Sequence, residues 1–398
     1  MGAGTMGAGA TTTQVAVVGA GPAGLLLSHL LALAGIDSVV VEVRDRAAVE
    51  TTIRAGLLEH GTVELLVACG VGDRLQREGA THDGILLRFA GQTRRIDLRG
   101  LTGRSVTLYP QHEVLKDLIA ARLAAGGDVR FAVGDVALHD LTTDRPRVTF
   151  HSADGTAVDL HCAVVAGCDG SGGVSKRSIP TGCRADRFRA YPFGWFGILA
   201  DAPRSSDELV YAHSDRGFAL ISTRTESVQR MYFQCDPQEQ ADGWTDEQIW
   251  AELQARVAAD GFVLEEGRIF DRTVIPLRSH VCEPMRYGQL FLAGDAAHTV
   301  PPTGAKGMNL AVADVRVLAE ALEVYFTGGR TDLLDAYSDT ALRRVWKAQH
   351  FSWWMTSMLH KLEGASDFDV RRQLGELDMV TSSAAGSAYL AEAYVGWP

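Results

Sequence analysis

The sequence predicts an α/β fold, α+β overall, with a parallel sheet first along the chain, an antiparallel sheet second and long helices last. Residues 14–18 form a short apolar strand pattern, a Gly-rich stretch follows, and residues 23–34 have helical spacing of apolar side chains. A second apolar strand over 38–42 completes a βαβ unit, which begins a parallel sheet. Large apolar and polar side chains alternate over residues 191–235, as in antiparallel strands. Helical patterns fill most of residues 307–362.

Shorter patterns complete this plan. Helical spacing over residues 52–71 predicts one helix, with Arg54 in its first turn and Gly70 as its stop. We also expect short strands over 84–107, helices over 113–125 and 245–258, and strands over 163–166 and 290–293.

These elements divide the chain into four predicted parts. They are a flexible N-terminal extension (1–12), the first part of the parallel-sheet domain (13–183), an antiparallel-sheet domain that holds the substrate (184–284), and a C-terminal part that completes the first domain and adds a helical interface region (285–398).

Composition and charge exclude several classes of function. The 398 residues are 46% hydrophobic and 22% charged, which is typical of a globular protein and not of a disordered one. The 38 Lys and Arg against 49 Asp and Glu give a formal net charge of −11, which disfavours nucleic-acid and membrane binding. The six cysteines contain no Cys-x-x-Cys pair, so we expect reduced structural thiols and no metal site. No secretory signal or long apolar run is visible, and we expect a cytoplasmic protein.

A nucleotide-binding motif lies in the first βαβ unit. Gly19, Gly21 and Gly24 have the spacing G-x-G-x-x-G between a strand and a helix, and Glu42 ends the next strand. In a Rossmann-like fold the glycines allow a tight turn and close approach of a pyrophosphate, and the acid binds a ribose hydroxyl. The alternative, a Gly-rich turn without a ligand, does not explain all four residues together.

Two further motifs favour FAD over NAD as the resident dinucleotide. Asp295 follows the strand at 290–293, where it could bind a flavin ribityl hydroxyl. The stretch that follows enters a helix at Gly307, Met308 and Asn309, whose backbone amides could face the flavin pyrimidine ring. Asp169 lies between glycines after another buried strand. Each motif alone is also compatible with an ordinary turn.

The combination resembles the single-component FAD-dependent aromatic hydroxylases, and in particular those that act on 4-hydroxybenzoate. The similarity runs from about residue 13 to residue 398, through the glycine motif and the stretches 53–56, 191–195, 292–309 and 351–356. The resemblance implies a homodimer that binds FAD, takes NADH or NADPH as a transient electron donor, and uses O2 through a flavin C4a-hydroperoxide. It further implies conversion of 4-hydroxybenzoate to 3,4-dihydroxybenzoate.

Four residues are candidates for holding the substrate. Ser222 and Arg224 alternate on one strand and therefore share a face, and a planar guanidinium matches a benzoate carboxylate. Without the resemblance, a solvated surface arginine would be the simpler interpretation. The resemblance assigns Ser222, Arg224 and Tyr232 to the carboxylate end of the substrate, and it places Thr303 beside the reacting centre.

The resemblance also implies a proton relay. It equates Tyr211 and Tyr394 with a tyrosine pair at the substrate hydroxyl and His82 with the histidine that links them to solvent. Ordinary phenol and imidazole pKa values of about 10 and about 6.5 make such a relay chemically reasonable. Pro302 resembles the proline whose carbonyl stabilises the transition state, although a turn proline is the ordinary interpretation.

The remaining assignments concern the two nucleotides. Arg54, Gln111 and Asp295 resemble FAD ligands, Asn309 resembles a flavin contact, and Arg44 and Arg278 are candidates for binding the nicotinamide cofactor. NADPH-preferring members have arginines where this chain has Val43 and Thr52. We therefore expect NADH to be used at least as well as NADPH.

Three alternatives remain open from the sequence. The same chemistry could act on another amino- or hydroxy-substituted benzoate, because one sequence shows no pocket volume. An FAD oxidase or dehydrogenase on the same fold is less favoured, and a non-enzymatic flavin-binding protein is the least favoured of the three.

Overall fold

The computed structural model describes residues 9–54, 56–259 and 261–397. One six-stranded sheet has the order β19-β20-β13-β2-β3-β9. Its parallel strands are β20 (Leu290–Leu292), β13 (Val164–Gly167), β2 (Val15–Val18), β3 (Ser38–Val41) and β9 (Asp128–Arg130), and β19 (Arg286–Tyr287) joins them antiparallel. The four central strands are buried along their whole length, as expected for a sheet covered on both faces.

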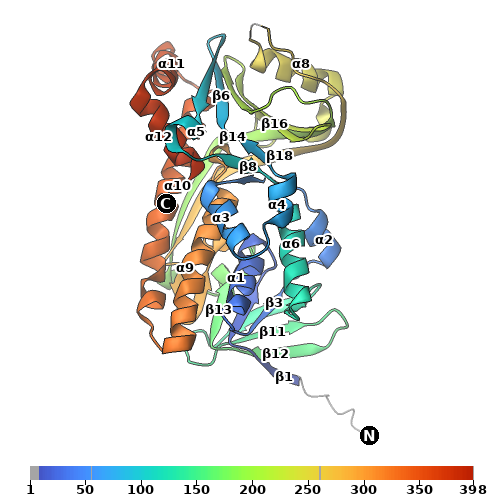
Figure 1. Cartoon of the computed structure of the whole chain (residues 1–398), viewed down its shortest axis with the longest axis vertical. Coiled ribbons are helices and arrows are strands. Elements are labelled where there is room, and N and C mark those ends of the chain that lie inside the picture. The colour runs from blue at the N-terminus through green and yellow to red at the C-terminus, as the bar shows by residue number, and fades with distance from the viewer. Residues whose placement is uncertain (1–8, 55, 260, 398) are drawn as a thin grey trace.

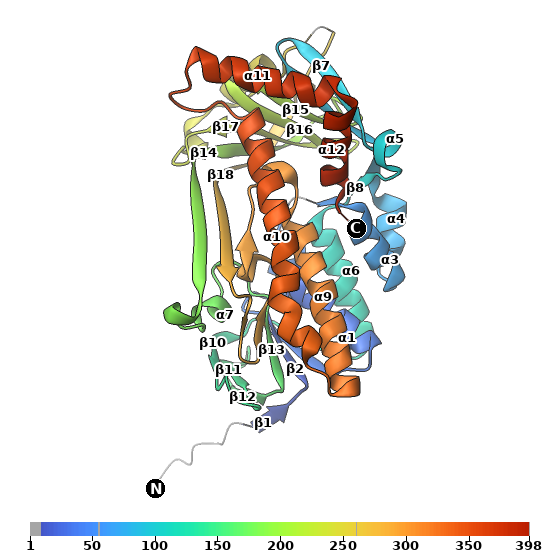
Figure 2. The same ribbon diagram turned by 90° about the vertical axis from the view of Figure 1, so that its left-hand side faces the viewer.

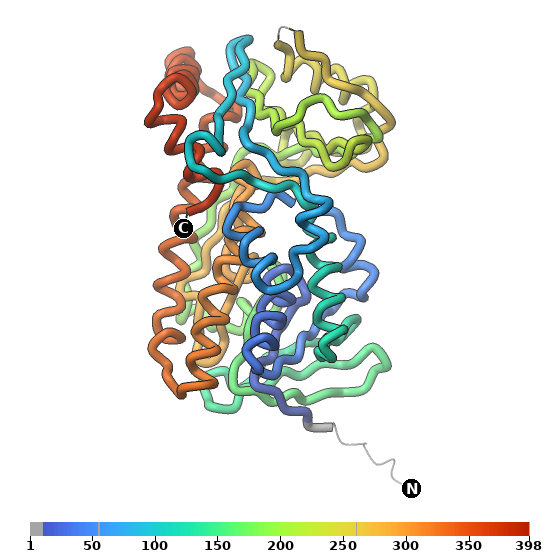
Figure 3. The backbone as a smooth tube through the Cα atoms, viewed as in Figure 1, coloured from blue at the N-terminus to red at the C-terminus, as the bar shows by residue number. Residues whose placement is uncertain are grey.

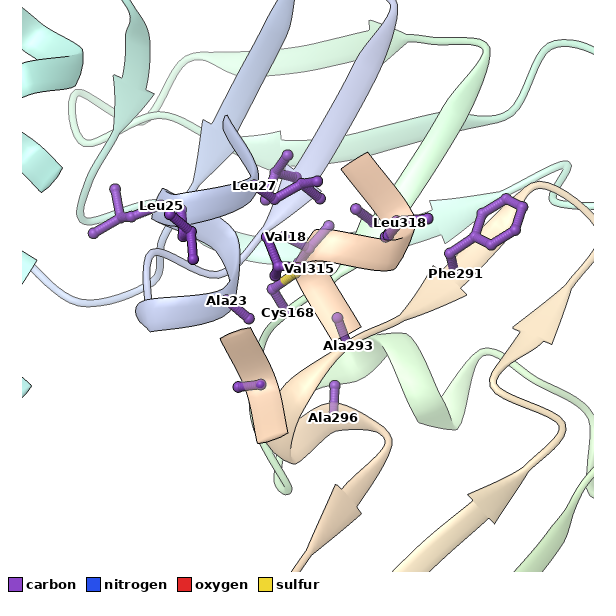
Figure 4. Packing of buried hydrophobic residues seen from close by; sticks show 14 of the residues in the cluster. Val18, Ala23, Leu25, Leu27, Cys168, Phe291, Ala293, Ala296, Val315 and Leu318 are labelled. Atoms are coloured by element: carbon purple, nitrogen blue, oxygen red, sulfur yellow. The ribbon is translucent and has the colours of Figure 1, made fainter. Parts of the chain in front are cut away.

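Helices from both ends of the chain pack together beside this sheet (Figure 1). Helix α1 (Pro22–Leu33) packs against α6 (Gln111–Ala124) and α9 (Gly307–Gly328), and α9 packs against α10 (Asp332–Leu359). Figure 4 shows the resulting apolar contact, in which Val18, Ala23, Cys168, Ala293 and Val315 converge from three strands and two helices. The glycine motif therefore lies where the N-terminal and C-terminal segments of the chain meet.

The second large sheet is mainly antiparallel and has eight strands in the order β21-β18-β14-β17-β16-β15-β6-β7. Their bounds are β21 (His298–Thr299), β18 (Arg268–Glu283), β14 (Ala185–Asp201), β17 (Val228–Cys235), β16 (Gly217–Thr225), β15 (Leu209–Ser214), β6 (Gly84–Phe89) and β7 (Gln92–Asp97). The predicted parallel and antiparallel sheets are both confirmed. Residues 84–97 pair with this second sheet, although they belong to the first part of the chain, and the tube in Figure 3 shows them rising to it.

Helices cover both faces of the antiparallel sheet. On one face, α10, α11 (Asp367–Ser382) and α12 (Ala384–Val395) bury an aromatic-rich cluster that includes Trp195, Tyr211 and Tyr232. On the other, α8 (Asp246–Val257) packs with Ile249, Trp250 and Leu253. Figure 2 shows β14, β18 and α10 extending along most of the molecule, so that they join the two sheets into one body.

Two small sheets complete the fold. One has the order β4-β8-β5, with β4 (Leu57–Leu58), β8 (Val106–Leu108) and β5 (Ala80–His82). The other has the order β1-β12-β11-β10, with β1 (Gly9–Thr12), β12 (Ala157–His161), β11 (Arg147–His151) and β10 (Gly134–His139). The short helices are α2 (Arg46–Thr51), α3 (His60–Ala68), α4 (Asp73–Glu78), α5 (Leu98–Thr102) and α7 (Val174–Arg177).

Most expected elements are confirmed, but the single helix over residues 52–71 is wrong. Strand β4 and helix α3 replace it, and Arg54 lies in the segment between the end of α2 at Thr51 and β4. The reason is tertiary pairing: β4 pairs antiparallel with β8, and the Gly56 carbonyl accepts a hydrogen bond of 2.8 Å from the Tyr109 N–H. A side chain at Gly56 would overlap the Tyr109 carbonyl.

The N-terminal extension also differs from its expectation. Residues 9–12 form β1, which pairs in parallel with β12, and so they are a strand instead of a flexible extension. Residues 1–8 lie outside the described residues. All six cysteines are free thiols, as expected. Within the described chain, no helix is long and apolar enough to cross a membrane.

A neutral histidine supports the aromatic core of the second sheet. His360 is fully buried; its Nδ1 lies 2.9 Å from the Thr356 carbonyl and its Nε2 lies 2.7 Å from the Trp195 indole Nε1. The indole N–H donates to Nε2, so Nδ1 carries the imidazole proton and donates to the carbonyl. Burial lowers the pKa of His360 to about 3.

We predict that this histidine makes the protein sensitive to mild acid. The unfolded imidazole binds a proton below about pH 6.5 whereas the folded one does not, so the stabilisation is complete above pH 6.5 and falls with pH. Between pH 7 and pH 5, urea unfolding should show a loss of up to about 2 kcal/mol more in the wild type than in His360→Gln. Equal losses in the two proteins would contradict the assignment.

Candidate active site

The glycine motif forms a tight crossing between β2, α1 and the end of β13. Gly19 has φ of +104°, a backbone conformation that favours glycine, and a side chain there would collide with the Cys168 carbonyl. A side chain at Gly24 would overlap the Gly19 carbonyl oxygen. Gly21 is the N-cap of α1 and provides no side-chain cap. The first N–H groups of α1 are therefore available to an anion.

Glu42 lies just past β3 and faces this turn. Its Oε2 accepts a hydrogen bond of 2.7 Å from the Ala20 N–H, and its Oε1 accepts from the backbone N–H and the Nε of Arg44, at 3.0 and 2.9 Å. The buried carboxylate thus holds the glycine turn as well as lying where a ribose would bind. Arg44 is paired with this carboxylate, which neutralises much of the charge predicted for the nicotinamide cofactor.

Asp295 lies in a short turn after β20. Burial raises the pKa of its carboxyl, and the charges of His298, Arg54 and Arg278 oppose the rise. Arg54 is exposed, and Arg278 donates to the Ser171 hydroxyl at 3.0 Å. No ion pair joins Asp295 to either arginine among the described residues, and the joint role of the three in cofactor binding stays a prediction.

A buried ion pair stabilises the turn that contains Asp295. The Asp314 Oδ2 accepts from the Gly294 N–H at 2.9 Å and lies 2.6 Å from the His298 Nε2. Burial opposes protonation of His298, but the Asp314 charge outweighs it and raises the pKa of the imidazole. The motif analysis missed this pair; the only sequence signal is a histidine three residues after Asp295.

Asp169 holds a neighbouring turn. Its Oδ2 accepts a hydrogen bond of 2.9 Å from the Ser175 N–H at the start of α7, while its Oδ1 is buried and has no partner among the described residues. Burial raises the pKa of this carboxyl. The structure therefore gives Asp169 a structural contact, and the unpartnered oxygen is consistent with its prediction as a cofactor residue.

The N-terminus of the long helix α9 forms the other wall. The first N–H of α9 that donates within the helix is that of Leu310, to the Lys306 carbonyl at 2.8 Å. The N–H groups of Gly307, Met308 and Asn309 precede it and make no backbone hydrogen bond in the described chain. The Asn309 side chain is not free: it accepts from Glu59 N–H and Thr62 Oγ1 and donates to Leu57 and Ala305 carbonyls, all within 2.9 Å. Any contact of Asn309 with a flavin ring therefore comes from its backbone.

Together these features fit FAD. The glycine motif, where no side chain intrudes, matches the pyrophosphate. The carboxylates of Asp169 and Asp295 match the ribityl part, and the open N-terminus of the 22-residue helix α9 matches the pyrimidine ring. Gln111 is the first residue of α6, is half-buried, and makes no side-chain hydrogen bond within the described residues. Among the same residues, no cluster of three or more His, Cys, Asp or Glu could hold a metal ion.

The predicted substrate residues share one face of the antiparallel sheet. Leu220 pairs with both Tyr211 and Tyr232, and Ser222 lies two residues further along the same strand. Opposite residues in antiparallel strands point to the same side, as do residues two apart. Gly197 lies opposite Tyr232, and a side chain there would overlap the tyrosine ring. All four paired side chains are buried among the aromatic cluster under α10 and α12.

Arg224 lies at a β-bulge. The register of β16 and β17 shifts between Thr223 and Thr225, so Arg224 has no opposite partner and its side chain is re-aimed. Its Nε is buried without a partner among the described residues, and burial lowers the pKa of the guanidinium. Arg224 is half-buried, and a guanidinium whose buried Nε lacks an acid partner is a strong site for an anionic group.

Arg230 is a second buried cation that the sequence reasoning missed. It pairs with Ser222, is 6% exposed, and has two nitrogens, Nε and Nη1, without partners in the described chain. Its guanidinium lies 5.2 Å from the Tyr232 ring centroid. The signal was present, because Arg230 is two residues before Tyr232 on one strand and therefore shares its face.

Tyr211 and Tyr394 form the predicted tyrosine pair. Their hydroxyl oxygens are 2.7 Å apart, their rings are nearly perpendicular, and both side chains are at most 2% exposed. Burial raises the pKa of Tyr211 to about 12 and raises that of Tyr394 well above its usual value. Both phenols are therefore protonated at neutral pH, and each can pass a proton only as the other replaces it.

His82 is buried on β5, and no hydrogen bond joins it to either tyrosine within the described residues. Its Nδ1 is buried without a partner, and burial lowers the pKa of the imidazole. The structure thus shows the first link of the predicted relay and leaves the His82 link a prediction.

Pro302 and Thr303 lie in a short 3-10 turn before α9. The Pro302 carbonyl accepts from the Ala305 N–H at 2.9 Å, so one of its lone pairs is used by the turn itself. Thr303 is fully buried, with its hydroxyl oxygen 2.8 Å from that of Thr356 on α10. The turn is thereby held between α9 and α10.

A buried Lys306–Glu59 ion pair fixes this turn to the rest of the site. The Lys306 Nζ donates to Glu59 Oε1 at 2.6 Å and to the Tyr394 carbonyl at 3.1 Å, and both side chains are at most 6% exposed. Burial lowers the pKa of Lys306. Lys306 was not among the predicted site residues, and a lysine inside a Gly- and Pro-rich turn was the available sequence signal.

Comparisons with known proteins agree with this geometry. Residues 12–352 match the family described as FAD binding domain. The chain is 47% identical over 388 residues to the p-hydroxybenzoate hydroxylase of Acinetobacter baylyi, covering 97% of this chain and 96% of that one. It is 25% identical to a 3-(3-hydroxy-phenyl)propionate/3-hydroxycinnamic acid hydroxylase of Comamonas testosteroni, covering 89% of this chain and 58% of the relative.

Solved structures share the fold. The p-nitrophenol 4-monooxygenase of Pseudomonas putida superposes with a TM-score of 0.82 at 18% identity, covering 98% of this chain and all of that one. The anhydrotetracycline hydroxylase of Streptomyces rimosus superposes with a TM-score of 0.74 at 24% identity, covering 97% of this chain and 76% of that one.

The glycine crossing makes one prediction. In Gly24→Ala the new methyl group would overlap the Gly19 carbonyl, which should cost about 1–3 kcal/mol or more and prevent FAD retention. Visible flavin absorbance after gel filtration and a melting curve measure both effects. The control is Gly375→Ala, at an open site on α11, which should keep FAD and be neutral or stabilising by up to about 1 kcal/mol. Normal flavin content in Gly24→Ala would refute the close-contact role.

Proposed function

The chain belongs to the FAD-dependent aromatic hydroxylases, flavoprotein monooxygenases that bind FAD, and we propose that it converts 4-hydroxybenzoate, NAD(P)H, H⁺ and O2 to 3,4-dihydroxybenzoate, NAD(P)⁺ and water. The observation that carries this proposal is the sheet face that bears the Tyr211–Tyr394 pair together with Ser222, Tyr232 and Arg224. A phenol-binding hydroxyl pair and a carboxylate-binding guanidinium within one apolar cluster match the two polar ends of that substrate.

The Arg224 guanidinium holds the substrate carboxylate. Its buried, unpartnered Nε lacks an acidic group among the described residues, and a carboxylate would satisfy it bidentately. Ser222 and Tyr232 add hydroxyl donors on the same face, and Arg230 adds a second positive charge. The site therefore selects a benzoate over an uncharged phenol.

Tyr211 makes the ring reactive. Tyr211 accepts the proton of the substrate hydroxyl as it passes its own proton to Tyr394, which in turn releases its proton. The substrate becomes a phenolate, whose ortho carbon is electron-rich. Bound FAD, reduced by NADH or NADPH, would supply the electrons that activate O2. We propose that His82 passes the proton to solvent and that the second lone pair of the Pro302 carbonyl faces the reacting ring.

The protein also keeps water from the reacting ring. The tyrosine pair lies within a cluster that includes Trp195, Phe218, Leu220 and Phe351, all at most 7% exposed. A dry cavity favours insertion of oxygen into the substrate over release of peroxide. This supports hydroxylation over the oxidase alternative.

The first test is oxidation of NADH and NADPH by the FAD-loaded protein, with and without 4-hydroxybenzoate, with the product identified by mass. Substrate should accelerate oxidation and yield stoichiometric 3,4-dihydroxybenzoate. Acceleration with peroxide alone would indicate that 4-hydroxybenzoate mimics another substituted benzoate. No acceleration and no product would refute the proposal.

Arg224→Met tests the carboxylate assignment. Loss of a bidentate, charge-assisted pair should weaken 4-hydroxybenzoate binding roughly 100-fold or more and leave FAD bound. Titration of the flavin absorbance with substrate measures the Kd. Arg94→Met, which removes an exposed arginine from β7 of the same sheet, is the matched control and should bind substrate normally. Normal affinity in Arg224→Met would mean that another group binds the carboxylate.

The coenzyme preference makes a separate prediction. Arg44 is paired with Glu42, Arg46 is paired with Glu50 at 2.7 Å, and Asp45 caps α2. The arginines after β3 are thus already neutralised, and a 2′-phosphate would gain little from them. We expect kcat/KM for NADH to equal or exceed that for NADPH. A ratio strongly in favour of NADPH would contradict this.

We further propose that the protein is a homodimer. Phe188 on β14 and Trp346 and Trp353 on α10 are large apolar side chains that are between 38% and 64% exposed. Sedimentation at several concentrations measures the assembly state, and a monomer at every concentration would contradict the proposal.

A further inference from the structure

One cavity of the protein lies outside the residues assigned to FAD and substrate. It has a volume of about 180 Å³ and opens where β6 and β15 end, beside α8 and α11. Its charged or titratable lining residues are Arg88, His213, Asp215 and Arg256. Three of these four side chains are more than nine-tenths buried, which is unusual for a cavity without a task.

Arg88 is the central group. It is 7% exposed, its Nη1 donates to the Val257 carbonyl at 2.8 Å, and its guanidinium lies 3.6 Å from the Phe262 ring centroid. Its Nε is buried without a partner, and none of the described acids forms an ion pair with it. Burial alone lowers the pKa of this guanidinium.

Arg256 contributes a second set of hydrogen-bond donors. Its Nε donates to Glu252 at 2.7 Å and its Nη1 to the Phe218 and Gln234 carbonyls, while its Nη2 has no protein acceptor in the described chain. The Glu252 carboxylate is shared with Arg216. Asp215 is exposed at the rim of the cavity. The three arginines thus outnumber the two acids.

His213 lines the cavity from the other face of the sheet. Its neighbour Ala212 pairs with Arg88, so His213 and Arg88 point to opposite sides. The His213 Nδ1 donates to the Leu359 carbonyl of α10 at 3.0 Å, whereas Arg88 contacts Val257 and Phe262. The candidate anion donors are therefore the two arginines.

We propose that this cavity is a binding site for a small inorganic oxyanion, held by Arg88 and Arg256. A buried cation without a counter-charge is costly, and an anion at the Arg88 Nε removes that cost. The volume corresponds to about six waters, which is room for one tetrahedral oxyanion and part of its hydration.

Sulfate is the probe, because it is a tetrahedral oxyanion that is fully ionised at neutral pH. Melting curves of the FAD-loaded protein are measured with sulfate up to about 20 mM, with ionic strength held by NaCl. Tm should rise with the logarithm of sulfate concentration. Arg88→Met should abolish the rise, and Arg99→Met, which removes an exposed charge, should retain it. Equal responses of Arg88→Met and Arg99→Met would overturn the proposal.

A second measurement does not depend on the variant folding. Crystals of the wild type soaked in selenate should show anomalous density against Arg88 and Arg256, and its absence there would overturn the proposal. Asp260 lies outside the described residues and near Phe262 in sequence, so Asp260→Asn is included. A sulfate response that appears only in Asp260→Asn would mean that the protein supplies its own counter-charge, which would also overturn the proposal.

Discussion

The buried Lys306–Glu59 ion pair joins four segments that are far apart in sequence. Glu59 precedes α3, Lys306 precedes α9, the Tyr394 carbonyl of α12 accepts from Lys306, and Arg344 of α10 lies 3.7 Å from Glu59. A side chain at Gly396 would overlap the Glu59 carboxylate, so the C-terminal turn is held against the same pair. Removal of either partner would leave an uncompensated buried charge. The position of Tyr394, and with it the tyrosine pair, depends on this contact.

The two large sheets are likewise held in place by contacts between segments that are far apart in sequence. The parallel sheet ends in glycines and acids that suit a dinucleotide, and the antiparallel sheet presents an aromatic face that suits a benzoate. Strands β14 and β18 and helix α10 extend along both, so neither sheet can move as a separate body (Figure 2). The chemistry needs a cofactor and a substrate at a fixed separation, and these long shared elements supply it.

The sequence allowed prediction wherever the information is local. The glycine motif and the acid after β3 depend on neighbours within a few residues, whereas the expected shared face of Ser222 and Arg224 is altered by a bulge. The helix over 52–71 was wrong because pairing of β4 with β8 depends on residues 106–108. The Asn309 side chain, the His298–Asp314 pair and the bulge at Arg224 were invisible for the same reason: each is defined by a partner from another element. The resemblance supplied the tyrosine pair, which no local pattern indicates.

The order of strands in the parallel sheet has a consequence for synthesis on the ribosome. Strand β20 lies beside β13, yet the chain makes β14 through β18 between them. The nascent parallel sheet therefore waits with one side of β13 uncovered while the whole antiparallel sheet emerges. The early-made β6 and β7 wait in turn for β15. Unpaired strand edges of this kind can pair with other chains and aggregate. Folding of this chain therefore depends on both sheets completing their strand pairing late and nearly together.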